Sequence, residues 1–159
     1  MTRSHLVQDT PAEFYAGAYR LDAGIIIPDI TLQRKLLETI AGPTYSDLHN
    51  EDYSVLANPT NTRFQNCTEH TLDVLFSSLY RTADRGRIKA NIAAYFEPHP
   101  IEVSGFKRLL APVTSAALRT SDRGVGIATA TFGSIGRFMT NYELAEAVFT
   151  LTPDGKRFN

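Results

Sequence analysis

Cys67 is the residue of this chain whose type and position best suit covalent chemistry. It is the single cysteine among 159 residues, and it follows Asn66, a residue type that often caps the start of a helix. The thiolate is the reactive form of cysteine, and the unpaired N–H groups and positive dipole end of a first helical turn stabilise it. The sequence therefore predicts a nucleophilic sulfur at a helix N-terminus. Burial of Cys67 as a small hydrophobic side chain is the alternative.

A cysteine nucleophile needs an oxyanion site and a base. The backbone N–H of Cys67, together with the amides of Gln65 and Asn66, is our candidate for the oxyanion site. The base of a cysteine hydrolase usually comes from a distant part of the sequence, so His5 and His49 are our candidates for that role. His5 lies in a strand-like segment and His49 in a polar loop.

Other kinds of site find less support in the sequence. His70 follows Cys67 by one helical turn and would favour the thiolate if it were protonated. Because the sequence has no paired cysteines and no HExxH motif, we expect no metal site. The glycines of segments 124–126 and 133–136 match neither a P-loop nor a dinucleotide fingerprint, so we expect no cofactor.

Capping residues and periodicity predict the elements that position these groups. The apolar run 23–27, closed by Pro28, predicts a buried strand. Asp29 then caps a helix over residues 30–41, with Leu36, Leu37 and Ile40 on one face, which Gly42-Pro43 ends.

The polar stretch 44–65 is long for a loop in a compact domain, and such loops are often functional. Only residues 53–57 interrupt it with a strand-like pattern. Asn66 opens the clearest helix, in which Glu69 stands where it can complete a capping box.

The second half of the chain alternates helices and short strands without a regular strand–helix–strand rhythm. The expected elements are a helix over 83–96, a short helix capped by Ser104, strands over 125–131 and 147–152, a helix over 134–141 between them, and a turn at 153–155. This order predicts a single α+β domain rather than a doubly wound sheet.

Composition excludes several classes of protein. The chain is 43% hydrophobic and 21% charged, which is typical of a globular domain and excludes a disordered chain. With a net charge of −1, the chain lacks the excess of basic residues that is typical of nucleic-acid-binding proteins, so we expect no nucleic-acid partner. The first nine residues lack the apolar stretch of a signal peptide, and the longest apolar run is too short to span a membrane. The compartment stays open: the lack of a signal peptide favours the cytoplasm, and a longer native precursor would favour the periplasm.

The segment from Tyr53 to Cys67 resembles the central motif of a bacterial family catalogued as domain of unknown function 2145. That motif is an aromatic-Ser-x-x-Ala-x-Pro stretch followed by Tyr-Gln-Asn-Cys. The similarity extends to segments 25–40, 95–98 and 130–138, the last of which is similar to a Ser-Ile-x-x-Phe block of the family.

The Asn-Cys helix start is also similar to permuted papain-like proteins, namely NlpC-type cell-wall hydrolases and lecithin:retinol acyltransferase-like proteins. This resemblance implies a central helix that starts at Asn66/Cys67 and packs on a small antiparallel sheet. It further implies that Cys67 is a nucleophile toward an amide, ester or peptide bond in a small-molecule, peptide or lipid substrate.

Two other functions stay open at this point. Family members carry a Ser-His-Ala-Gly-type histidine strand upstream of the segments matched here, so we expect a shortened or reduced form without that base. The alternative function is then a non-catalytic α+β module for binding or assembly. A regulatory thiol that senses oxidants is the third possibility.

Overall fold

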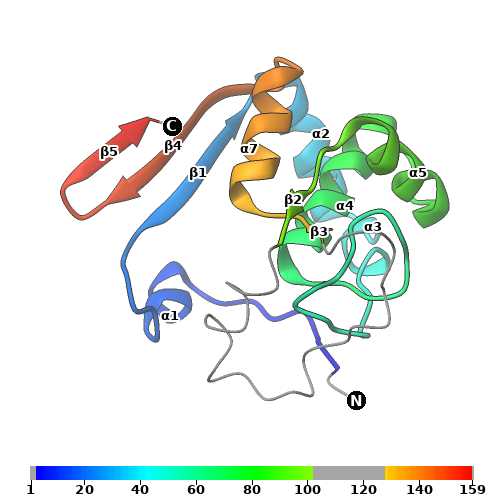
Figure 1. Cartoon of the computed structure of the whole chain (residues 1–159), viewed down its shortest axis with the longest axis horizontal. Helices are drawn as coiled ribbons and strands as arrows, with labels where there is room; N and C mark the ends of the chain where they lie inside the picture. Colours follow the sequence, from blue (N-terminus) through cyan, green and yellow to red (C-terminus); the bar gives the residue numbers. More distant parts are fainter. Residues whose placement is uncertain (1–2, 102–127, 159) are drawn as a thin grey trace.

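A layer of helices packs against one face of a small antiparallel sheet (Figure 1). The computed structural model of the chain describes residues 3–101 and 128–158. The sheet has the strand order β1-β4-β5, formed by Ala23–Pro28, Ala145–Thr152 and Gly155–Phe158. The predicted α+β class is confirmed.

Strand pairing brings β1, from the N-terminal part of the chain, beside β4, from its C-terminal part. β1 pairs antiparallel with β4, so that Ile25 lies opposite Phe149. β4 and β5 form a hairpin whose turn ends at Gly155, which has a φ of 126° that favours glycine. The predicted turn at 153–155 is therefore confirmed. β1 is only partly buried rather than fully buried as predicted, because the helices cover one face of the sheet.

Four of the described helices lie close to their predicted positions, namely α2 (Ile30–Ala41), α4 (Cys67–Tyr80), α5 (Arg85–Tyr95) and α7 (Phe132–Asn141). The helices α1 (Pro11–Tyr15) and α3 (Thr44–Asp47) were not predicted, and α3 lies at the start of the stretch that was expected to be a loop. Two short strands, β2 (His99–Pro100) and β3 (Ala128–Thr129), pair with each other. As predicted, Asp29 caps α2: its Oδ1 accepts hydrogen bonds from the N–H groups of Thr31 (2.8 Å) and Leu32 (3.1 Å).

Three predictions about these elements need correction or lie outside the described residues. Leu36, Leu37 and Ile40 were expected on one apolar face of α2, but Leu37 and Ile40 are 67% and 49% exposed, and Leu36 alone of the three packs on the core. Residues 53–57 form no strand, because Tyr53 makes only an isolated bridge to Gln65. The helix expected at Ser104 and residues 125–127 of the expected strand lie outside the described residues.

The position of α4 also differs from the expectation. We expected this helix on the sheet, but it packs mainly on α2 and α5, and α7 is the helix that contacts β4 and β1 (Figure 1). A stack of the Phe76 and Phe138 rings, with centroids 5.0 Å apart, joins α4 to α7. α7 approaches β4 so closely that a Cβ at Gly136 would lie 3.0 Å from Val148 Cγ1.

We expect Gly24→Ala to destabilise the protein by about 1–3 kcal/mol, because the new methyl group would overpack the contact between β1 and α7. A Cβ at Gly24 would lie 2.6 Å from the Phe132 ring, so that ring would have to move. Urea unfolding measures the effect. Gly17→Ala is the matched control, because a Cβ at Gly17 has no atom within 4 Å. Equal stability of the two variants would contradict the prediction.

Candidate functional site

The predicted helix start at Cys67 is confirmed. α4 begins at Cys67, and the Oδ1 of Asn66 accepts a hydrogen bond from the N–H of Glu69 at 2.9 Å. The expected capping box does not form, because the Glu69 carboxylate is directed to Lys89 instead. The Cys67 side chain is exposed, which contradicts the alternative of a buried small hydrophobic residue.

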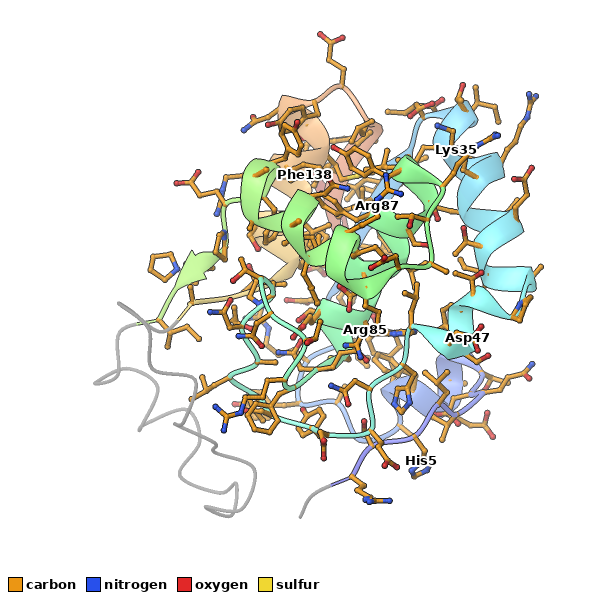
Figure 2. The ribbon with its side chains drawn as sticks, turned by 90° about the vertical axis from the view of Figure 1, so that its right-hand side faces the viewer. His5, Lys35, Asp47, Arg85, Arg87 and Phe138 are labelled. Carbon is orange, nitrogen blue, oxygen red and sulfur yellow. The ribbon has the colours of Figure 1, made fainter. Side chains whose placement is uncertain are left out.

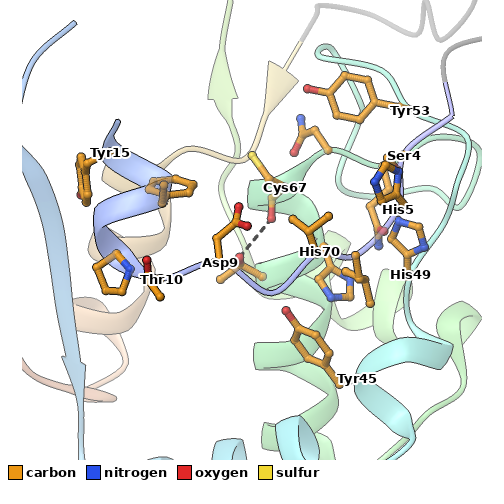
Figure 3. A pocket seen from close by; sticks show the side chains of 17 residues that line it. Ser4, His5, Asp9, Thr10, Tyr15, Tyr45, His49, Tyr53, Cys67 and His70 are labelled. Carbon is orange, nitrogen blue, oxygen red and sulfur yellow. Dashed lines mark hydrogen bonds between the residues drawn. The ribbon is translucent and has the colours of Figure 1, made fainter. Parts of the chain in front are cut away.

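A cavity of about 600 Å³ opens beside Cys67 (Figure 3). The N-terminal segment from Ser4 to Tyr15, the loop that follows α3, and the first turn of α4 form its walls. Three of the four histidines of the chain line it, namely His5, His49 and His70. The tertiary structure thus brings both candidate bases to the cavity that contains the candidate nucleophile.

Contacts with the loop after α3 place the N-terminal segment over this cavity. Arg3 forms an isolated bridge with Asp52 and an ion pair with Glu51 at 3.2 Å. The N–H of Ser4 donates to the Glu51 carbonyl at 2.9 Å. The expected strand around His5 is absent, so His5 stays exposed on an extended segment (Figure 2).

His49 is held more firmly than His5. It is half-buried, its Nε2 lies 3.2 Å from the Ser4 hydroxyl, and its ring centroid lies 6.1 Å from that of His70. Within the described residues, no hydrogen bond joins the Cys67 sulfur to an imidazole. The cavity therefore gathers the nucleophile and the histidines without a formed Cys–His pair.

The Gln65 side chain fixes the loop on both sides of His49. Its Oε1 accepts from the N–H of Asn50 at 2.8 Å, and its Nε2 donates to the Leu48 carbonyl at 3.0 Å and to Asp73 Oδ2 at 2.9 Å. These bonds occupy both N–H groups of the amide. Gln65 therefore positions the loop, and its side chain has no donor left for an oxyanion.

The Asn66 amide is occupied in the same way. Its Nδ2 donates to the Val55 carbonyl at 3.1 Å and to the Thr129 hydroxyl at 3.2 Å. The Asn66 cap accepts only from the N–H of Glu69. The N–H groups of Cys67 and Thr68 have no intrahelical acceptor, because they belong to the first turn of the helix. These two backbone groups are the donors available to an anion at the start of α4.

A buried ion-pair cluster lies behind the site. Lys89 Nζ, on α5, lies 2.6 Å from Glu69 Oε1 and 2.6 Å from Asp73 Oδ1, and all three side chains are almost fully buried. Arg85 starts the same helix, facing the loop that precedes α4 (Figure 2). Because Asp73 also accepts from Gln65, the cluster supports the loop that carries His49.

Burial shifts the pKa values of three groups near the cavity. Desolvation outweighs the attraction of Lys89 and raises the pKa of Glu69 to about 8. Desolvation likewise lowers the pKa of His70, against the attraction of Asp73, so His70 is neutral at pH 7 and cannot supply the positive charge considered for it. Burial, followed by the charge of Cys67, raises the pKa of Tyr53, whose hydroxyl therefore remains a hydrogen-bond donor.

Sequence reasoning missed Tyr53 and Asp9, which also line the cavity. Tyr53 opens the aromatic-Ser motif that precedes Cys67, so the motif was a usable signal for it. No comparable signal marks Asp9, which the N-terminal segment carries over the cavity (Figure 3).

We expect the stability of the protein to fall as the pH rises from about 5 to 8, because folded Glu69 keeps its proton while an unfolded glutamate loses it near pH 4.5. Glu69→Gln should remove more than about 1 kcal/mol of this decline. Urea unfolding at pH 5.5 and pH 8 measures it. The exposed Glu38→Gln is the matched control and should keep the wild-type slope. An unchanged slope in Glu69→Gln would contradict the assignment.

Residues 3–101 and 128–158 contain neither a candidate metal site nor a helix that could span a membrane. In that part of the chain, no group of three or more His, Cys, Asp or Glu side chains is arranged to hold a metal ion. None of the described helices is both long and apolar enough to cross a bilayer.

Comparison with known proteins gives one match. No curated protein and no solved structure matches the chain. The sequence profile of a family described as "Uncharacterized protein conserved in bacteria (DUF2145)" matches residues 1–139, which is most of the chain. The protein therefore belongs to this bacterial family, DUF2145.

Proposed function

We propose that the protein is a cysteine-dependent acyl hydrolase or acyltransferase with Cys67 as its nucleophile. The observation that carries this proposal is an exposed sulfur at the first turn of α4, in a cavity of about 600 Å³ that histidines line. An amide, ester or peptide carbonyl entering the cavity would meet the sulfur at the end of the helix that stabilises a thiolate. The permuted papain-like arrangement is part of the same proposal.

His49 is our choice of base, because the Gln65 amide holds its loop and Ser4 contacts its ring. The Ser4 hydroxyl lies within 3.4 Å of the Asn50 carbonyl, to which it can donate, so its oxygen can accept from the Nε2–H of His49. That tautomer leaves Nδ1 free to take the thiol proton. His5, on the exposed N-terminal segment, is the second candidate.

The reaction has two halves. The thiolate of Cys67 adds to the carbonyl carbon, and the oxyanion accepts hydrogen bonds from the N–H groups of Cys67 and Thr68 and from the Tyr53 hydroxyl. The carbon–leaving-group bond then breaks, the leaving group takes the proton from His49, and a thioester remains. Water or an acceptor alcohol or amine attacks the thioester and restores the thiol.

A second candidate function is a non-catalytic binding module. The observation that favours it is the lack of a hydrogen bond between the Cys67 sulfur and an imidazole within the described residues. The side-chain amides of Gln65 and Asn66 also donate to groups of the protein itself, which leaves no N–H of theirs for a substrate. In this function the cavity would bind its ligand without a covalent step.

Labelling of the thiol separates the two functions. We expect iodoacetamide at pH 6 to alkylate Cys67 faster than it alkylates a model cysteine peptide, and p-nitrophenyl acetate to leave one acetyl group on Cys67, detected by mass spectrometry. Prior alkylation should block the acetylation. Cys67→Ser is a clean control, because it removes the single thiol of the chain. A thiol that reacts no faster than the peptide would favour the binding module.

A further inference from the structure

A second cavity, of about 310 Å³, adjoins the one that contains Cys67. The two cavities share three lining residues, Tyr45, His70 and Thr71. Apart from these three, every described residue lining the second cavity is aliphatic, methionine or proline. α2, α4 and α7 supply most of this lining with Leu36, Ile40, Val74, Leu75, Ile135 and Met139.

The polar groups of this apolar pocket are confined to its junction with the Cys67 cavity. His70 is 8% exposed, and neither of its ring nitrogens has a hydrogen-bond partner among the described residues. Its ring lies against Tyr45, with centroids 4.9 Å apart. The Thr71 hydroxyl donates to the Cys67 carbonyl at 3.1 Å (Figure 3). A buried imidazole without a partner is unfavourable, and a polar ligand atom at the junction would relieve this.

We propose that the apolar pocket binds the hydrocarbon part of the acyl group that reacts with Cys67, so that the substrate is an ester, thioester or amide of an aliphatic acid of medium chain length. This inference rests on the proposed function. The acyl carbonyl lies at the sulfur, and the chain passes His70 and Tyr45 into the pocket between α2, α4 and α7.

The chemistry of the walls selects this substrate class. Beyond the junction the pocket offers no group that could pair with a charge or a peptide bond, and burying such groups unpaired is costly. Burial of methylene groups is favourable instead, because each methylene moved from water into an apolar site strengthens binding by about fourfold. A chain of several methylenes is therefore the ligand that this pocket would bind most tightly.

Chain-length preference tests the inference. We expect the wild-type protein to react with p-nitrophenyl octanoate at a kcat/KM at least about tenfold above that for the acetate ester. Leu36→Trp, which fills the pocket from α2, should lower this ratio toward one. Leu37→Trp is the matched control, because Leu37 is the next residue of α2 and is 67% exposed, and it should keep the wild-type ratio. If Leu36→Trp does not fold, Ile40→Trp at the half-exposed rim should lower the ratio instead.

A binding measurement separates this inference from the proposed function. Calorimetry should detect octanoate binding to Cys67→Ser, with a loss of at least about tenfold in affinity when Leu36→Trp is added. Equal reaction of acetyl and octanoyl esters in the wild type would overturn the acyl pocket and leave Cys67 as the nucleophile. Binding of octanoate that depends on Leu36, without acylation of Cys67, would support the pocket and overturn the enzyme. No octanoate binding would overturn the pocket.

Discussion

Lys89→Met is expected to lower the free energy of unfolding by about 3–5 kcal/mol. Lys89 Nζ lies 2.6 Å from carboxylate oxygens of both Glu69 and Asp73, and the side chain of Lys89 is 4% exposed. Without the ammonium group two buried carboxyls lose their cation, and an uncompensated buried charge is strongly unfavourable. Equilibrium unfolding in urea at pH 7 measures the loss.

The control for this prediction is Lys35→Met on α2, since Lys35 makes no ion pair within the described residues. It should change stability by less than about 0.5 kcal/mol. The double variant Lys89→Met/Asp73→Asn should recover part of the loss, because Glu69 holds its proton at pH 7 and Asp73 is the other carboxyl that loses its cation. A loss below about 1 kcal/mol in Lys89→Met would show that the cluster contributes little to stability.

Cys67→Ser is expected to lower turnover of p-nitrophenyl esters by at least about 10³-fold, because a hydroxyl is a far weaker nucleophile than a thiolate at neutral pH. His49→Gln should lower kcat by about 10²–10⁴-fold, the usual contribution of a general base. Steady-state kinetics of the purified variants between pH 5 and 9 measure both effects.

His5→Gln separates the two candidate bases. His5 is exposed on an extended segment, whereas bonds from Gln65 fix the loop of His49, so we expect His5→Gln to keep most of the wild-type rate. A large loss in His5→Gln with an active His49→Gln would assign the base to His5. Full activity in both variants would contradict general-base catalysis by either residue and favour the binding module.

The sequence determined the local elements of this protein. The caps Asp29 and Asn66 start α2 and α4 where they were predicted, and Gly155 ends the predicted hairpin turn. Each of these features depends on contacts within about four residues, so side-chain chemistry at one position is enough to define it. The same reasoning placed Cys67 at the first helical residue, which is the basis of the candidate site.

Only the tertiary structure decided which distant groups meet. The Glu69 carboxylate pairs with the buried Lys89 and forms no capping box, because α5 brings the Lys89 ammonium group to that face of α4. Ser4 and His49, 45 residues apart in the chain, come together only because the N-terminal segment pairs with the loop after α3. Such contacts depend on which faces are buried against which, and this depends on the packing of the whole domain rather than on spacing along the chain.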